Sequence, residues 1–217
     1  MIVTIDGPSG VGKSTAARKL AERLGFRFLD TGAMYRALAL FAHQQGVSWE
    51  DDTALSQLLS HFDLQMQPGG VILLGDRVVT DAIRTPDISQ GASRVAVRPV
   101  VRERLAQLQR QLAQHGRIVC EGRDQGTVVF PQAQCKFFLT ADLEVRVERR
   151  ARELEQRGQN VDREQLRQEM AQRDERDSSR AVGALQRADD AILIDSSNLS
   201  CEEVLQQMET EVRRRLA

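Results

Sequence analysis

The feature that most constrains this chain is the stretch GPSGVGKST, from Gly7 to Thr15, which directly follows an apolar run at residues 2–5. Glycine allows sharp turns and lets the main chain approach a ligand closely. The spacing G-x-x-x-x-G-K-S is that of a P-loop, in which successive N–H groups cradle phosphates, the lysine reaches the terminal ones and the hydroxyl binds Mg²⁺. The stretch therefore predicts a nucleoside triphosphate site.

The residues on both sides of this loop have the pattern that a P-loop requires. The run IVTI before it is β-prone, and STAARKLAERL, residues 14–24, repeats alanine and leucine at helical spacing after it. The glycines therefore open a helix, whose N-terminus adds partial positive charge to an anion site.

Short apolar runs recur at residues 2–5, 26–29, 117–120, 136–139 and 191–194, with helical patterns between them. This alternation predicts an α/β fold with a parallel sheet covered by helices on both faces. Ligands of such sheets bind beyond the carboxyl ends of the strands. Functional residues are therefore expected directly after the runs, at residues 30–31, 121–124 and 195–196.

The helical patterns cover residues 14–24, 32–45, 50–60, 99–115, 143–157, 163–176 and 201–215, the last with a capping box formed by Ser200 and Glu203. Residues 62–84, FDLQMQPGGVILLGDRVVTDAIR, show no such pattern. They predict a small antiparallel meander with a hairpin turn at Gly69-Gly70, inserted into the α/β core.

Composition excludes several classes of protein. The formal net charge is -1, which gives no overall field to attract nucleic acid or an anionic membrane. No apolar run approaches the roughly 18 residues of a membrane span, and the N-terminus lacks a leader pattern, so we expect a cytoplasmic protein. The cysteines, Cys120, Cys135 and Cys201, are expected to be reduced thiols. The three histidines lack metal-site spacing, and we assign no zinc.

The most charged stretch, residues 149–180, holds nine arginines and eight acidic residues. Most of it is expected to be a solvated helix face with i,i+4 ion pairs. Its end, RDERDSSR at residues 173–180, is expected to leave the helix as a loop that reaches over the phosphate site as a lid.

A P-loop alone does not distinguish a GTPase, a mechanical ATPase and a small kinase. The chain lacks the Asn-Lys-x-Asp element of guanine-specific modules and is short for a motor, which favours a metabolite kinase. A hydroxyl acceptor would need a carboxylate base, whereas a phosphate acceptor is already ionised and needs cations to offset its repulsion. Surplus arginines at strand ends and in the lid favour a nucleoside monophosphate kinase; they are Arg36, Arg123, Arg173, Arg176 and Arg180.

Five segments in this order closely resemble the bacterial cytidylate kinase family: GPSGVGKST, LDTGAMYRALA, GASRVAVRPVVR, EGRDQGTVVFP and RDERDSSR. The resemblance implies ATP-dependent phosphorylation of CMP and dCMP with Mg²⁺. It also implies a monomer and a P-loop kinase fold with a five-stranded parallel sheet. Residues 1–217 would form one kinase unit, with a monophosphate-binding insertion at about 61–98 and a lid at about 151–165. The alternatives are a kinase of another metabolite and a non-catalytic ATP-binding module.

The resemblance also implies roles for individual residues. The donor would be cradled by the loop Gly7, Pro8, Ser9, Gly10, Val11, Gly12, Lys13, Ser14 and Thr15, with Lys13 bridging the transferring group and Ser14 binding Mg²⁺. The catalytic cations would be Lys13, Arg36, Arg123, Arg173 and Arg180, of which Arg36, Arg123 and Arg180 hold the CMP phosphate. Cytosine would be bound by Ser93, Arg102 and Asp124, while Thr31 and Asp177 lie close to the monophosphate. Further lid cations would be Arg150 and Arg176.

Three of these residues have structural alternatives. Arg36 fits a surface helix position, Asp124 fits an ion pair with a neighbouring arginine, and Ser93 fits a helix cap. The chain also departs from the family at Glu121, where an aspartate is usual, and at Ser14, where a glycine is frequent.

Overall fold

The computed structural model describes residues 1–114, 116–156 and 158–216. It comprises two compact units, one formed by residues 1–29 and 113–217 and the other by residues 30–112. Two expected helix ends, His115 and Arg157, lie outside the described residues. We describe each unit separately.

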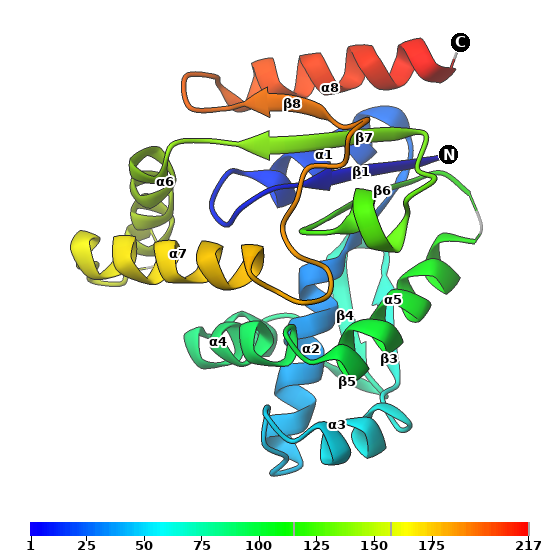
Figure 1. Cartoon of the computed structure of the whole chain (residues 1–217), viewed down its shortest axis with the longest axis vertical. Coiled ribbons are helices and arrows are strands. Elements are labelled where there is room, and N and C mark those ends of the chain that lie inside the picture. Colours follow the sequence, from blue (N-terminus) through cyan, green and yellow to red (C-terminus); the bar gives the residue numbers. More distant parts are fainter. Residues whose placement is uncertain (115, 157, 217) are drawn as a thin grey trace. The chain divides into compact units, whose positions relative to one another are not determined.

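The first unit is built on a five-stranded sheet (Figure 1). The strand order is β2-β6-β1-β7-β8. Neighbouring strands in the pairs β1–β6, β1–β7 and β7–β8 run parallel. The bounds are β1 Ile2–Asp6, β2 Arg27–Asp30, β6 Ile118–Gly122, β7 Cys135–Thr140 and β8 Ile192–Asp195. Each expected apolar run is a strand, so the prediction of a parallel five-stranded sheet is confirmed.

Helices α1 (Lys13–Leu24) and α8 (Cys201–Leu216) pack against this sheet through one apolar core. Leu20 of α1, Phe137 of β7 and Leu205 of α8 are at most 1% exposed. Burying side chains of this size contributes about 1.5–3 kcal/mol each. The expected capping box holds the start of α8, because Ser200 N–H donates to Glu203 and the Glu203 N–H donates back to the Ser200 hydroxyl.

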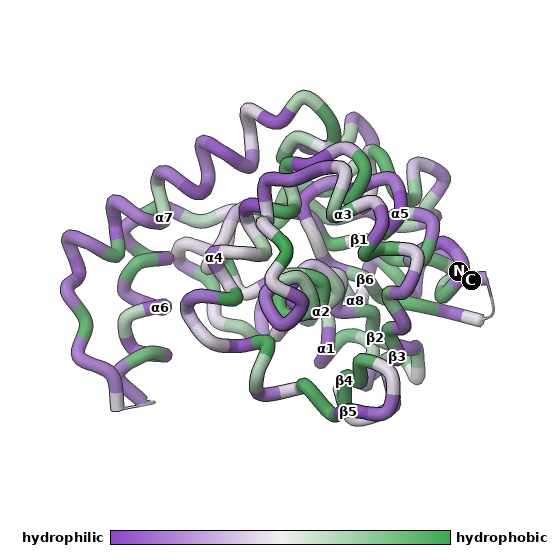
Figure 2. Tube along the Cα trace, turned by 90° about the horizontal axis from the view of Figure 1, so that it is seen from below, coloured by the Kyte–Doolittle hydropathy of each residue, from purple (hydrophilic) through white to green (hydrophobic). Residues whose placement is uncertain are grey.

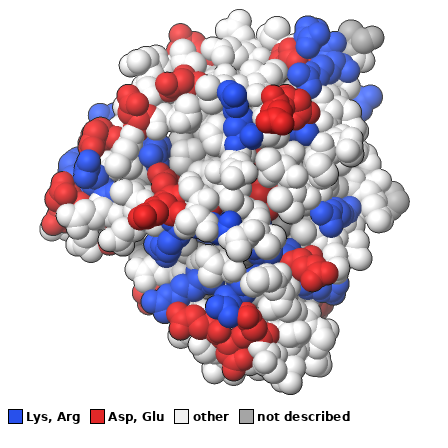
Figure 3. All heavy atoms as spheres, in the orientation of Figure 1, with Lys and Arg blue, Asp and Glu red and all other residues white. Residues whose placement is uncertain are grey.

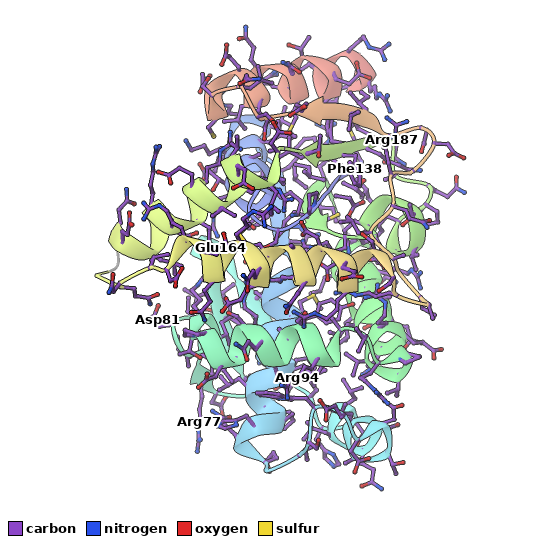
Figure 4. All side chains as sticks on the ribbon, turned by 60° about the vertical axis from the view of Figure 1, so that its left-hand side comes forward. Arg77, Asp81, Arg94, Phe138, Glu164 and Arg187 are labelled. Atoms are coloured by element: carbon purple, nitrogen blue, oxygen red, sulfur yellow. The ribbon has the colours of Figure 1, made fainter. Side chains whose placement is uncertain are left out.

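Helices α6 (Leu143–Gln156) and α7 (Arg163–Ser178) lie side by side in the first unit. They share a small apolar cluster of Val147, Ala151, Leu166 and Met170. Apart from such positions α7 is hydrophilic along its length, and Glu164 marks its first turn (Figures 2 and 4). None of the helices in the described residues is long and apolar enough to cross a membrane.

The expectation that residues 173–180 form a loop is wrong. Helix α7 continues to Ser178, so Arg173, Arg176 and Asp177 are helical, and only Ser179 and Arg180 lie beyond the helix. No glycine or proline interrupts residues 163–178. The last turn is further held by Asp177, which is 1% exposed and accepts a hydrogen bond from Arg123.

The second unit consists of helices around a small antiparallel sheet. Its helices are α2 (Thr31–Gln44), α3 (Asp52–Leu59), α4 (Pro86–Val95) and most of α5 (Pro99–Ala113). Its strands are β3 (Leu64–Gln67), β4 (Val71–Leu74) and β5 (Arg77–Val78), in the order β3-β4-β5. Both strand pairs are antiparallel, and Gly69 and Gly70 turn the first hairpin with φ of 79° and 81°. The predicted meander is confirmed.

Helix α4 was not predicted from the sequence, although Pro86 at its first position is typical of a helix start. It packs closely against Trp49, because a Cβ added at Gly91 would lie 2.5 Å from the indole Cζ2 atom. The indole N–H donates to the Ala39 carbonyl at 3.0 Å, and the Arg94 guanidinium lies 5.8 Å from the ring centroid. Trp49 therefore ties α2 to α4.

The start of the glycine-rich loop allows a direct test. Gly7 has φ 150°, and a Cβ there would lie 2.0 Å from the Leu139 carbonyl oxygen of β7. We expect Gly7→Ala to lower the free energy of unfolding by about 3 kcal/mol, measured by urea denaturation. The matched control is Gly25→Ala at φ 65°, where an added Cβ would meet no atom within 4 Å apart from its chain neighbours and where we expect a loss of about 1 kcal/mol. Equal losses in the two variants would contradict the close approach at Gly7.

Candidate active site

The glycine-rich loop lies between the carboxyl end of β1 and the first turn of α1. Gly10 and Gly12 have φ of 81° and 91°, a left-handed region that favours glycine. Gly12 is the N-cap of α1, and because it has no side chain, the N–H groups of the first turn face outward without a capping side chain. The loop therefore presents main-chain donors at a helix N-terminus, an arrangement that binds anions.

Lys13 is buried at 5% exposure, and its ammonium donates to the Pro8 carbonyl at 2.6 Å. Burial lowers the pKa of Lys13 to about 7, with further lowering by Arg123 and Arg173, while Glu121 and Asp177 act in the opposite direction. An ammonium held among other cations is poorly stabilised, and the phosphates of a nucleotide would supply the missing negative charge.

Ser14, in the first turn of α1, donates from its hydroxyl to Glu121 at 2.9 Å. Glu121 lies in β6, the strand next to β1, and is 5% exposed. In the part of the chain that the structure describes, no three His, Cys, Asp or Glu residues form a metal cluster. A hydroxyl beside a single carboxylate does fit Mg²⁺, which takes oxygen ligands and often binds through one or two protein groups plus substrate phosphates.

A carboxylate bridges two arginines near this lysine. Asp177 accepts from Arg123 Nε at 2.7 Å and also from Arg180. The side chains of Arg123 and Arg180 are 16% and 6% exposed. Burial alone would raise the pKa of Asp177, but Arg123, Arg180 and Arg173 outweigh burial and lower it. Three guanidinium groups therefore act on this one carboxylate, and Glu121 and Asp174 also act on Arg123.

Sequence reasoning missed Asp6, the last residue of β1. It is 4% exposed and accepts from the N–H groups of Gln125 at 2.9 Å and Gly126 at 2.7 Å. Both donors belong to a π-helical turn, Gln125–Val129, that follows Asp124. Burial raises the pKa of Asp6 to about 7 despite these bonds. Asp6 could have been predicted as a site residue from its position at a strand end directly before the glycine-rich loop. Its hydrogen bonds hold the residues that follow Asp124 beside β1.

The predicted residues Thr31 and Arg36 lie on α2 in the second unit. Thr31 is 2% exposed, and the side chain of Arg36 is 22% exposed with its Nη2 3.3 Å from both carboxylate oxygens of Asp30. Asp30 also caps α2 by accepting from the Ala33 N–H at 2.8 Å. Arg36 is therefore a partly buried, ion-paired residue rather than a simple surface position.

Ser93 and Arg102 are buried polar residues of the same unit. Ser93 is 7% exposed and lies inside α4, so it is not an N-cap of that helix. Arg102, on α5, is 5% exposed; it donates to the Ala96 carbonyl at 3.1 Å and lies 6.0 Å from the ring centroid of Tyr35. Tyr35 therefore helps to fix the orientation of this guanidinium.

The remaining predicted cations lie on α6 and α7. Arg150 pairs with Glu153 at 2.6 Å, and Arg176 donates to the Gln172 carbonyl at 3.2 Å. Acidic and basic side chains are interspersed on the face that Figure 3 shows. Ion pairs such as Arg152 with Glu148, at 2.8 Å, confirm the expected solvated helix faces.

Solved structures with the same fold include a gluconokinase from Sinorhizobium meliloti, 15% identical with a TM-score of 0.50 over 98% of this chain and 91% of that one. An uncharacterised protein from Eubacterium ventriosum is 16% identical with a TM-score of 0.52 over 99% and 98%. At these identities the likeness concerns the fold alone.

Relatives of known family are much more similar. Cytidylate kinases from Geobacter sulfurreducens and Stutzerimonas stutzeri are each 48% identical over 99% of this chain, covering 94% and 96% of their own lengths. The enzyme from Carboxydothermus hydrogenoformans is 45% identical over 96% of this chain and 95% of its own. A family description, cytidylate kinase, matches residues 3–214. Because that match includes both the glycine-rich loop and the arginine cluster around Asp177, the chain belongs to the cytidylate kinase family.

Proposed function

We propose that the protein transfers the γ-phosphoryl group of ATP to the 5′-phosphate of CMP, and of dCMP, to give ADP and CDP or dCDP. The observation that carries this proposal is the group of arginines around Asp177, two of which, Arg123 and Arg173, lie close enough to Lys13 to lower its pKa. Several arginines gathered beside a P-loop lysine suit a reaction in which two phosphate anions meet.

The chemistry needs no proton acceptor on the protein. The CMP phosphate is largely ionised at neutral pH, because its second pKa is about 6. One of its oxygens forms a bond to the γ-phosphorus while the bond from that phosphorus to the bridging oxygen of ADP breaks, and ADP leaves with the electron pair. Lys13 would stabilise charge on the transferring group, while Arg36, Arg123 and Arg180 would orient the acceptor and offset its repulsion. Thr31 and Asp177 would lie close to the acceptor's phosphate and ribose.

Ser14 would bind Mg²⁺, with Glu121 accepting from the same hydroxyl and so orienting its lone pairs. When bound, the ion supplies charge neutralisation between the donor phosphates. Glutamate is one methylene longer than the usual aspartate, and here that length spans the 2.9 Å contact with Ser14.

Base selection is proposed for Ser93, Arg102 and Asp124. The exocyclic amino group of cytosine donates to a carboxylate such as Asp124, and Arg102 donates to the ring N3 or O2. Uracil instead has an acceptor at O4 and a donor at N3, so it would meet Asp124 and Arg102 with the wrong hydrogen-bonding groups. Each mispaired buried group costs about 1–3 kcal/mol. CMP is therefore preferred over UMP.

The proposed function also includes a substrate-binding region, a mobile lid and a monomeric state. Residues from about 61 to 98 would belong to the monophosphate-binding region, and residues from about 151 to 165 to a mobile lid. Arg150, Arg173 and Arg176, on the helices that flank these lid residues, would be its cations. The protein would act as a monomer in the cytoplasm.

The proposal is tested by a panel of monophosphates with ATP and Mg²⁺. CMP and dCMP should be phosphorylated much faster than AMP, GMP or UMP, measured by coupled ADP release. Equal rates across the panel would refute the specificity. ATP binding without transfer to any monophosphate would support a non-catalytic module instead.

Base reading has its own test in Asp124→Asn. Because an amide can donate to the uracil O4, we expect the preference for CMP over UMP, as a ratio of kcat/KM values, to fall about 10-fold or more. The dissociation constant of ATP should change much less. An unchanged ratio of kcat/KM values for CMP and UMP would show that Asp124 does not select the base. The matched control is Asp142→Asn, which removes a carboxylate next to α6.

A further inference from the structure

The main chain of Ser9, inside the glycine-rich loop, is held on both sides by side chains from α6 and α7. Its N–H donates to Asp174 Oδ1 at 3.3 Å, and its carbonyl accepts from Arg146 Nη1 at 3.0 Å. Arg146 also donates to Asp174 Oδ2, which closes a ring of three residues. Sequence reasoning assigned no role to Arg146 or Asp174.

Helix α7 touches the next residue of the loop as well. A Cβ added at Gly10 would lie 2.7 Å from Met170 Cε and 3.3 Å from Arg146 Cβ. Met170 and Asp174 are four residues apart, so they lie on one face of α7. This face therefore covers the Ser9–Gly10 part of the loop.

The two members of the ion pair differ in how firmly they are held. Arg146 is 8% exposed and has a further bond, from Nε to the Ala141 carbonyl at 3.0 Å. Asp174 is 20% exposed, and its carboxylate accepts from Arg146 and from the Ser9 N–H. Arg146 can thus keep the loop in shape while the Asp174 carboxylate leaves.

We propose that Asp174 is an internal anion that occupies a donor of the P-loop until the triphosphate displaces it. The proposal rests on the proposed function, since it needs a triphosphate in this loop. A carboxylate and a triphosphate on one short loop repel each other, and at an effective dielectric constant of about 20 such a repulsion is substantial at 4–5 Å.

Displacement of Asp174 would also affect the arginines that contact Asp177. Asp177 lies three residues further along α7 and holds Arg123 and Arg180. Both carboxylates belong to one helix, so a movement of α7 that followed release at Ser9 would reach the arginines that Asp177 holds. Donor loading would in this way prepare the site for the monophosphate.

The test is direct binding of a non-hydrolysable ATP analogue to Asp174→Asn, measured by calorimetry. We expect about 5-fold tighter binding, because a competing charged acceptor is lost, and a smaller gain at high salt. The matched control, Glu175→Gln, removes the same charge from the next, exposed position of α7 and should bind like the wild type. Binding by Asp174→Asn that is weaker than, or equal to, that of the control would overturn the proposal.

A second measurement uses the wild-type protein, in case the variant folds poorly. Inorganic tripolyphosphate is titrated into ¹⁵N-labelled protein. We expect the amide resonance of Ser9 to shift together with that of Lys13 as Asp174 is displaced. A Lys13 shift with an unmoved Ser9 resonance would overturn the proposal. Wild-type protein that phosphorylates CMP while Asp174→Asn and Glu175→Gln bind ATP equally would refute this inference alone, whereas no ATP binding at all would refute the proposed function too.

Discussion

Replacing Lys13 with methionine should lower CMP turnover by about 10³-fold and yet raise the thermal stability of the nucleotide-free protein at neutral and acidic pH. Turnover falls because the only cation within the P-loop motif is lost from the transferring group. Stability rises because methionine keeps most of the side-chain volume and removes an ammonium whose burial, beside Arg123 and Arg173, lowers its pKa to about 7.

The stability gain of Lys13→Met should decrease as the pH rises. In the unfolded chain Lys13 titrates near 10.5, and in the folded protein near 7. Between these two pKa values, Lys13 carries a proton in the unfolded state but not in the folded state. Lys13 therefore makes the stability of the wild type rise with pH over this interval. Below about pH 7 the ammonium is charged in both states, and its burial destabilises the fold to the full extent. The gain in Tm of Lys13→Met over the wild type should therefore be largest at about pH 6 and shrink towards about pH 10.

Circular dichroism melts and a coupled kinase assay check both halves. Lys19→Met is the matched control, since Lys19 lies exposed on the same helix, and it should keep turnover and show no such gain. A variant Lys13→Met that melts below the wild type at about pH 6 would show that the buried ammonium stabilises the fold.

Arg123→Met should lower kcat/KM for CMP by about 10³-fold while the dissociation constant of ATP changes by less than about 3-fold. Asp177 keeps Arg180 as a partner, so the fold loses only one ion pair. On the proposed function, the acceptor phosphate would lose a forked donor. Arg123→Lys should recover only part of the loss, because an ammonium cannot bind a phosphate through a planar fork.

The control for Arg123 is Arg152→Met, which removes a guanidinium that is 68% exposed on α6 and should leave both constants unchanged. Steady-state kinetics with varied CMP, together with ATP binding by calorimetry, separate the two effects. Equal losses of ATP affinity and CMP efficiency would show that Arg123 belongs to the donor site.

Much of the fold was predictable because the signals are local. The apolar runs became β1, β2, β6, β7 and β8 with ends shifted by one or two residues, and Gly69-Gly70 turned the first hairpin. The P-loop residues were found because their spacing alone defines the motif. In each case the residues that carry the signal are also those that form the element.

What the sequence did not predict depends on partners distant along the chain. The last turn of α7 is stabilised through Asp177, whose partner Arg123 lies 54 residues earlier. The hydrogen bond from the Ser9 N–H to Asp174 spans 165 residues, and that from the Gln125 N–H to Asp6 spans 119. The charge pattern of α7 is typical of a solvent-exposed helix. The neighbouring residues in the sequence do not distinguish Asp174 and Asp177 from the exposed acidic residues of the same helix.

The packing of Trp49 against Gly91 has a practical consequence. It is the only tryptophan in the sequence, and it belongs to residues 30–112. Intrinsic emission excited at the indole band therefore monitors α2 and α4 of this unit. Chemical denaturation followed by fluorescence and by far-ultraviolet dichroism would resolve whether the two compact units melt as one cooperative block, because the dichroism signal averages over both.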